Sequence, residues 1–253
     1  MLNGKDRWCL WLVDATPGEL RGSAILRERL ARVQSVRLNS DTASVRAAAR
    51  TPALFTQIRQ PARSYLALPE VSSQRRLYVP AAFFPADVIA GNKLITFPDA
   101  DLWLFGMLQS SMFMAWIRTV AGRLKNDPSI SPDLTYCTFP FPEPTAAQRV
   151  SVEEAARAVL DTRATHGPAS LEDLYDPLAM PVGLLRAHQR LDRVIDRLFA
   201  PRRRFTGDAD RLEVLFERYT EMTSEGRIDL AEPQSQAVIG LRRSGRRSAV
   251  KGS

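Results

Sequence analysis

The stretch WIRTVAGRLKNDPSISPDLTYCTFPFP, residues 116–142, combines features that do not fit one ordinary structural element. It begins as the end of an apolar helix, continues as a polar run that contains Lys125, Asp127 and Ser129, and closes in an aromatic and proline-rich segment. Lysine donates hydrogen bonds to guanine, and aspartate accepts one from the cytosine amino group, so the two side chains together suit a G·C pair in the DNA major groove. DNA reading is therefore the first hypothesis for this stretch.

The overall composition is that of a soluble globular protein, and its charge is unevenly distributed. The 253 residues are 45% hydrophobic and 25% charged, with a net charge of +7. Residues 1–145 hold 17 basic and 12 acidic side chains, whereas residues 146–240 hold 13 basic and 16 acidic ones. The last 13 residues hold 5 basic side chains and no acidic one. The positive charge of the first part favours a polyanionic partner. Residues 226–253 are expected to form a disordered basic tail.

The pattern of apolar and turn-forming residues predicts an α+β fold. Short strands are predicted at residues 7–14, 64–69, 77–80, 92–97 and 136–139, and helices at residues 17–37, 42–50 and 102–124. After the proline-spaced connector at residues 141–144, strand signals vanish and helical periodicity appears in residues 146–165, 182–199 and 208–223. We therefore expect a mixed α/β domain over residues 1–145, with a long buried helix, followed by a small all-α domain over residues 146–225.

Residue patterns that carry enzyme chemistry are scarce in this sequence. It contains neither G-x-G nor a phosphate-binding loop, and it lacks the Asn/Asp-Pro-Pro-Tyr tetrapeptide with which adenine methyltransferases stack a flipped base. With only two histidines, His166 and His188, a zinc cluster or a catalytic triad is improbable, and we expect His188 to be structural, paired with Asp192 one turn along its helix.

The cysteines and the N-terminus predict a cytoplasmic protein. Cys9 and Cys137 lie far apart without metal-ligand spacing, so both are expected to be buried, reduced thiols. The start of the chain does not resemble a signal peptide, and the apolar run at residues 102–117 is too short and too often interrupted for a membrane span.

Several runs together resemble the C-terminal region of MmeI-like enzymes, the single-chain type II restriction and adenine methylation proteins. The runs are RWCLWLVDATP, ALPEVSSQRRLYVPAAF, FGMLQSSMFMAWIRTVAGRLKND, YCTFPFP, SLEDLYDPLAMPVGLLRAHQRLDRVID and RLEVLFERY. The resemblance covers residues 7–222 and implies a DNA target recognition domain, N-terminally truncated, followed by a C-terminal helical domain. The family's nuclease and methyltransferase domains, with S-adenosylmethionine, would then lie upstream of Met1. On this basis the chain has no catalytic residues, binds no cofactor or metal itself, and is not catalytic alone.

The resemblance also assigns residues to individual base pairs of the target. It pairs Glu70 with Asn92 at a C·G pair, Lys93 with Ser129 at a second position where lysine favours guanine, and Lys125 with Asp127 beside the methylated adenine. These pairs imply a target that contains 5′-CGAG-3′. Four arginines are expected to contact phosphates, which position a protein without specifying sequence: Arg75, Arg76, Arg118 and Arg123.

Simpler interpretations remain open at these positions. Lys125 and Asp127 suit an exposed ion pair that contributes little, and Asn92 suits a turn after Gly91. At the level of function, the alternatives are a specificity subunit that pairs with a separately encoded methyltransferase chain, and a gene remnant without function.

Overall fold

The computed structural model describes residues 1–5 and 7–224, which form two compact units. Lys5–Gln60 make up one unit, and Met1–Gly4 together with the chain from Pro61 onward make up the other. The expected basic tail at residues 226–253 lies outside the described residues. Among the described residues, no helix has both the length and the apolar character needed to cross a membrane.

The Lys5–Gln60 unit is built from short helices joined by capped turns. They are α1 (Pro17–Gly22), α2 (Ala24–Leu38), α3 (Ala43–Ala47) and the 3₁₀ turn η1 (Ala48–Arg50). Ser23 ends α1 and caps α2 by accepting a hydrogen bond from the Leu26 amide, so the predicted helix over residues 17–37 is two helices. The Arg37 guanidinium donates to the carbonyls of Ala48, Thr51 and Leu54, which ties α2 to the loop that follows.

Two expectations for this part of the chain are wrong. Residues 7–14, predicted to be a buried strand, form no strand, and Trp8 is 95% exposed. Cys9 is exposed, and so is Cys137 in the other unit, so neither thiol is buried. An apolar run forms a buried strand only where a sheet edge pairs with it, and no strand within residues 7–224 pairs with this run.

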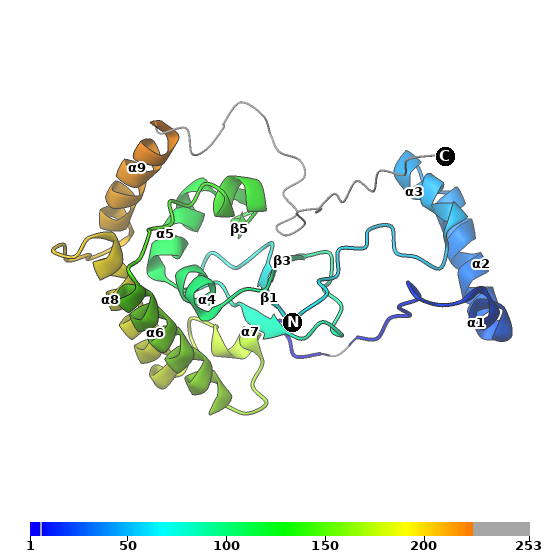
Figure 1. The fold of residues 1–253 in the computed structure, drawn as a ribbon, viewed down its shortest axis with the longest axis horizontal. Coiled ribbons are helices and arrows are strands. Elements are labelled where there is room, and N and C mark those ends of the chain that lie inside the picture. The colour runs from blue at the N-terminus through cyan, green and yellow to red at the C-terminus, as the bar shows by residue number, and fades with distance from the viewer. Residues whose placement is uncertain (6, 225–253) are drawn as a thin grey trace, which may run out of the picture. The chain divides into compact units, whose positions relative to one another are not determined.

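The second unit contains a three-stranded antiparallel sheet in the order β2-β1-β3. Its strands β1 and β3 are labelled in Figure 1. Strand β1 (Tyr65–Pro69) is buried along its whole length, between β2 (Ala82–Phe84) and β3 (Leu94–Pro98). The strands predicted near residues 64–69 and 92–97 are thus confirmed. The strand predicted at residues 77–80 is wrong, because there Tyr78 and the Val79 carbonyl bond to side chains of Asp192 and Gln109 instead of to a neighbouring strand.

The helix predicted over residues 102–124 is interrupted. Helix α4 (Leu102–Leu108) ends at Gln109, and Ser110 caps α5 (Ser111–Val120) by accepting from the Phe113 amide. Residues 122–124 form strand β4 instead of helix. The aromatic side chains of these helices lie in the core, as their helical spacing predicts: Trp103, Phe105, Phe113 and Trp116 are all buried.

The strand predicted at residues 136–139 is also wrong. A π-helical turn, η2 (Pro132–Tyr136), ends at the first of these residues, and residues 137–139 continue as a turn and a bend. The Ser131 side chain caps η2 by accepting from the Leu134 amide. Phe139, which follows the turn, is 1% exposed and packs edge-on against Phe113. The aromatic residues of this segment are therefore core residues without being a strand.

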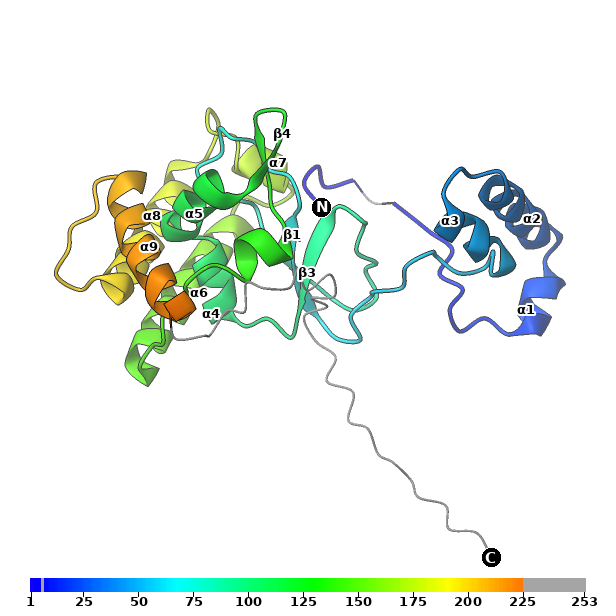
Figure 2. The same cartoon turned by 90° about the horizontal axis from the view of Figure 1, so that it is seen from above.

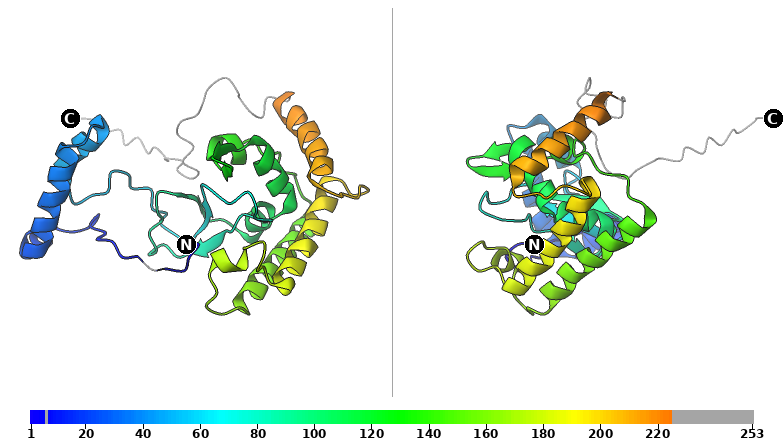
Figure 3. Two further views of the ribbon diagram at one scale, coloured as in Figure 1. Left: turned by 180° about the vertical axis from the view of Figure 1, so that it is seen from behind. Right: turned by 90° about the vertical axis from the view of Figure 1, so that its left-hand side faces the viewer.

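The three long C-terminal helices are confirmed, and they share one core with the sheet. They are α6 (Ala146–Ala164), α8 (Val182–Phe199) and α9 (Asp208–Ser224), with the short α7 (Leu171–Leu174) between α6 and α8. Helices α6, α8 and α9 form an outer layer of this unit (Figure 3). Helix α4 packs directly on α6, because Gly106 allows Val152 to approach closely. The whole is an α+β fold.

A buried polar network joins these layers around His188. The Nε2 atom of His188 lies 2.8 Å from the Tyr175 hydroxyl and its Nδ1 atom 3.1 Å from the Gln109 carbonyl, so the ring does not pair with Asp192 as expected. Arg163 donates from Nε to Tyr175 and from Nη1 to the Ala81 carbonyl. Burial and the Arg163 charge lower the pKa of His188 to about 3, which keeps the ring neutral. His188 is a structural residue here.

Candidate DNA-recognition site

The chain that leaves β1 connects the sheet to a second pair of strands. Glu70 donates its amide to the Lys93 carbonyl (3.0 Å), just before β3, and accepts from the Ile130 amide (2.6 Å) on its other side. Val71 then bridges to Ser129, and the Ser72 amide donates to the Pro128 carbonyl at 3.2 Å. These bonds place Lys93, Glu70 and Ser129 on three adjacent segments of backbone.

The β4–β5 hairpin carries the remaining candidates. Strands β4 (Gly122–Leu124) and β5 (Asp127–Ser129) pair antiparallel and leave Lys125 and Asn126 as a two-residue loop. In Figure 2 this hairpin protrudes from its unit beyond the ends of β1 and β3. Both loop residues are exposed, so the loop can reach into a groove.

Lys125 adopts a backbone conformation that is unfavourable for a lysine. Its φ is 57°, in the left-handed region that hairpin loops usually fill with glycine or asparagine. Strained residues of this kind persist where the surrounding structure holds them, and they cluster at functional sites. The strained backbone at Lys125 is therefore consistent with a functional role for its side chain.

Asp127 is held in place by the loop that follows β1. Its Oδ1 atom accepts a hydrogen bond from the Gln74 amide at 3.0 Å. No ion pair joins Asp127 to Lys125 in the described part of the chain, so the simple ion-pair interpretation of these two residues is not what the structure contains. The backbone bond fixes the orientation of the Asp127 carboxylate beside the hairpin loop.

Glu70 and Lys93, assigned to different base pairs, contact each other. Lys93 Nζ lies 3.1 Å from Glu70 Oε2. The Lys93 side chain is 79% exposed and the Glu70 side chain is 34% exposed. An exposed ion pair of this kind contributes at most about 1 kcal/mol, so base edges can compete for both groups. Asn92 is exposed next to Lys93 in the turn before β3. The structure thus brings all six base-reading candidates to one end of β1 and the adjoining hairpin.

The four candidate phosphate-binding arginines have different surroundings. Arg75 is exposed, whereas Arg76 is only 9% exposed and has little surface to offer a phosphate. Arg118 pairs with Asp208 at 2.7 Å and donates to the Arg76 carbonyl at 3.1 Å. Arg123 donates to the Ala121 carbonyl and, through its second amino group, to the Arg118 carbonyl. Of the four, Arg75 best suits a phosphate contact.

Sequence comparison identifies the family of this chain. Residues 1–143 match the family described as "MmeI, target recognition domain", and residues 144–226 match "MmeI, C-terminal domain". The chain belongs to the MmeI family. It is 36% identical over 222 residues to DNA methyltransferase A of Bacillus subtilis (strain 168), an alignment that covers 88% of this chain and 25% of that protein.

A solved structure of this family has the same fold. The Type IIL restriction-modification enzyme MmeI, in complex with DNA, superposes with a TM-score of 0.85 at 40% sequence identity. The superposition covers 88% of this chain and 30% of that enzyme. The chain thus spans about a quarter to a third of the length of these MmeI-family relatives.

Two contacts that support the candidate site could not be found in the sequence. Gln74 holds Asp127, although 53 positions separate them, and Asp208 in the first turn of α9 holds Arg118 from 90 positions away. Neither pair has a local spacing signal, because each forms only when the tertiary fold brings distant segments together. Arg118 resembles a surface cation in the sequence, but in the structure it donates to the Arg76 carbonyl and supports the chain segment that follows β1.

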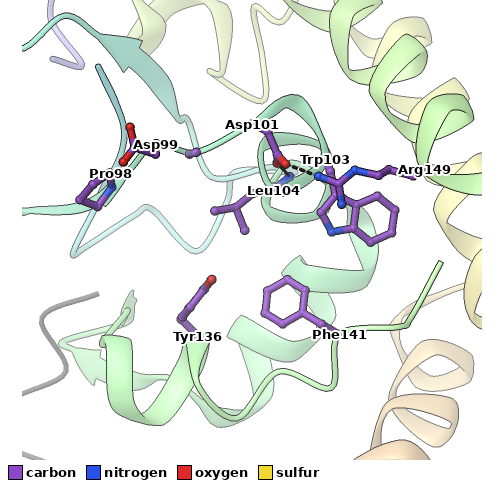
Figure 4. A pocket seen from close by; sticks show the side chains of 9 residues that line it. Pro98, Asp99, Asp101, Trp103, Leu104, Tyr136, Phe141 and Arg149 are labelled. Atoms are coloured by element: carbon purple, nitrogen blue, oxygen red, sulfur yellow. Dashed lines mark hydrogen bonds and ion pairs between the residues drawn. The ribbon is translucent and has the colours of Figure 1, made fainter. Parts of the chain in front are cut away.

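A pocket lined by polar and aromatic side chains lies away from the candidate site. It measures about 350 Å³ and is lined by Pro98, Asp99, Ala100, Asp101, Trp103, Leu104, Tyr136, Phe141 and Arg149 (Figure 4). The pocket adjoins the far end of β3, roughly 16 Å from Lys93 at ~3.3 Å per strand residue. Its Arg149 pairs with Asp101 and lies over the Trp103 ring, so its charges are already compensated.

Proposed function

We propose that this chain is a sequence-specific recognition module for double-stranded DNA. The observation that carries the proposal is the convergence of six polar side chains at one end of β1 and on the adjoining hairpin. They come from three separate segments of the chain, residues 70, 92–93 and 125–129, and main-chain hydrogen bonds hold those segments together. The related enzyme MmeI has been solved in complex with DNA, which supports the same conclusion.

The chemistry of the six side chains supports a target that contains 5′-CGAG-3′. Glu70 accepts from the cytosine amino group, with Asn92 beside it, and Lys93, with Ser129 beside it, donates to the guanine that follows. Lys125 donates to the last guanine, and Asp127 accepts from the cytosine paired with that base. The adenine between the two guanines is the base that a complete enzyme would methylate.

We further propose that this chain locates the target without modifying it. The sequence offers no glycine-rich cradle for S-adenosylmethionine, so the cofactor and the methyl transfer would belong to a methyltransferase domain outside residues 1–253. Methylation of a CGAG duplex by this chain with S-adenosylmethionine alone would contradict that division of labour.

A second possibility is a specificity subunit for a separately encoded methyltransferase chain. The observation that favours it is the exposed apolar run at residues 7–14, in which Trp8 is 95% and Leu10 is 52% exposed. Exposed apolar surface of this kind is typical of a protein interface. Co-purification of a methyltransferase chain that is lost with Trp8→Ser/Leu10→Ser, but not with Arg29→Ser, would support it.

Enrichment from a pool of random duplexes tests the proposed function. We expect the wild-type chain to enrich CGAG, and the variant Lys125→Ala/Asp127→Ala to lose the preference at its last base pair only. Arg157→Ala, a change at an exposed arginine of α6, is the matched control and should enrich the wild-type sequence. A wild-type selection that returns no common sequence would overturn the proposal.

A further inference from the structure

The outer face of α8 carries a line of four arginines. Arg186, Arg190, Arg193 and Arg197 are all exposed. Their spacing of four, three and four residues places them within an arc of about 60° at the helical 100° per residue. The opposite face buries Leu184, Leu191 and Ile195 in the core.

Within the part of the chain that the structure describes, no acidic side chain pairs with these four arginines. In residues 7–224 the structure contains no ion pair or hydrogen bond from any of their guanidinium groups, whereas nearby Arg203 and Arg211 both form ion pairs. The two acidic residues of α8 are engaged elsewhere: Asp192 accepts from Ser111 and Tyr78 inside the core, and Asp196 pairs with Arg211. The four arginines, which we call the α8 arginine face, thus present uncompensated positive charge.

We propose that the α8 arginine face binds the phosphodiester backbone of DNA outside the recognition sequence. The face extends about 16 Å along the helix at 1.5 Å per residue, and one strand of a duplex carries about five phosphates over that length of the duplex axis, at 3.4 Å of axis per nucleotide. Guanidinium groups suit phosphates because their planar donors can bond two oxygens at once. The inference rests on the proposed function, since it takes DNA as the partner.

The α8 arginine face and the proposed base-reading residues lie on different elements of the fold. Helix α8 belongs to the outer layer formed with α6 and α9, whereas the base-reading residues lie on the sheet and the β4–β5 hairpin (Figure 3). The backbone bound by α8 is therefore either a flank of the same duplex or a second duplex. The chemistry of recognition is the same in both cases.

The salt dependence of DNA binding tests the proposal. We compare the wild-type chain with Arg190→Gln/Arg193→Gln/Arg197→Gln, which keeps good helix formers on α8. The matched control Arg29→Gln/Arg50→Gln/Arg157→Gln removes the same charge from other exposed, unpaired arginines among the described residues. The slope of log K against log salt on a long CGAG duplex should fall by about 3 in the α8 variant, since each phosphate contact contributes about 0.9. The ratio of affinities for CGAG and scrambled duplexes should not change.

The salt slopes of the two variants distinguish DNA binding by α8 from a general effect of net charge. An unchanged slope in the α8 variant, or an equal fall in the control, would overturn the proposal, the latter because net charge alone would explain it. If the α8 variant binds more weakly only to long duplexes, the α8 arginine face contacts the DNA that flanks the target. If the variant instead fails to capture a second labelled duplex, the face binds a separate DNA molecule. If the wild-type chain shows no preference for CGAG, the proposed function fails, while the slopes still report on α8 separately.

Discussion

At the scale of single residues, the strained backbone of Lys125 bears on its proposed role in base reading. A lysine at φ 57° on an exposed loop tolerates an unfavourable conformation to place its amino group. We expect Lys125→Ala to reduce discrimination at one G·C pair by about 1–3 kcal/mol, the range for one good side-chain contact to a base. Competition binding with duplexes changed at single positions measures it. A loss of the same size on every duplex would show a phosphate contact instead.

Arg75 and Arg118 are expected to have different roles, Arg75 as a phosphate contact and Arg118 as a structural residue. Arg75 is exposed, whereas Arg118 is bonded to Asp208 and to the Arg76 carbonyl. We expect Arg75→Gln to lower the salt slope of DNA binding by about 1. Arg118→Gln should leave the slope unchanged and lower the thermal stability of the fold. A lower slope for Arg118→Gln with unchanged stability would restore its predicted role as a phosphate contact.

The lowered pKa of His188 predicts how the stability of the folded chain depends on pH. Its pKa is lowered to about 3 in the folded chain, whereas the unfolded side chain takes up a proton below its ordinary value of 6.5. Between these values the unfolded state binds more protons, so stability falls as the pH drops, by about 1 kcal/mol per pH unit. Above pH 6.5 the ring is neutral in both states and makes no such contribution.

Urea unfolding at about pH 7, 6 and 5, which spans this window, measures the dependence. His188→Gln should lose stability at neutral pH, because it disrupts the bonds to Tyr175 and Gln109, and should show a shallower fall with pH than the wild-type chain. His166→Gln is the matched control and should retain the wild-type slope. An identical slope in the two variants would assign the pH dependence to other groups.

At the scale of elements, the contact between α4 and α6 depends on one glycine. A Cβ atom at Gly106 would lie 2.9 Å from Val152 Cγ1 and 3.3 Å from the Ala156 Cβ. We expect Gly106→Ala to destabilise the fold by about 1–3 kcal/mol, the cost of overpacking a core. Adding Val152→Ala should recover part of that loss, because it removes the clashing methyl group.

A double-mutant cycle by chemical unfolding measures the coupling between these two positions. Gly183→Ala is the control, since its Cβ would lie 3.7 Å from Thr162 in ordinary contact, and it should be neutral or stabilising. Fully additive effects of Gly106→Ala and Val152→Ala would contradict this account of the contact.

The sequence predicts the elements that have their own periodicity, and it fails where distant side chains replace backbone pairing. Helices α6, α8 and α9 follow from helical spacing, and β1 and β3 from short apolar runs between turn residues. The segment at residues 77–80 is apolar like a strand, yet its polar groups bond to Gln109 and Asp192. These partners come from distant segments of the chain, which local patterns cannot reveal.

The candidate site was also predictable from the sequence only in part. Lys125 and Asp127 are recognisable from the chemistry of their side chains, and the resemblance to the MmeI family adds Glu70, Asn92, Lys93 and Ser129. Their convergence depends on the bonds from residues 70–72 to residues 128–130 and could not be read from the sequence. The same holds for the support that Gln74 and Asp208 give to the site.

At the scale of the whole molecule, the C-terminal helices are part of the recognition scaffold. They share a core with the sheet through the contact at Gly106 and the network around His188. Helix α9 also contacts Arg118 through Asp208, and Arg118 donates to the Arg76 carbonyl. The chain covers 25–30% of the length of its relatives and matches the target recognition and C-terminal domains of the family. The proposed sequence specificity can therefore be tested by DNA binding.

The most direct measurement is the affinity of the wild-type chain for a duplex that contains CGAG and for duplexes changed at one of its positions. We expect weaker binding, by about 1–3 kcal/mol, when the first C·G pair or either G·C pair is replaced. Equal affinity for all of these duplexes would contradict the claim that this chain reads DNA sequence through Glu70, Lys93, Lys125 and their neighbours.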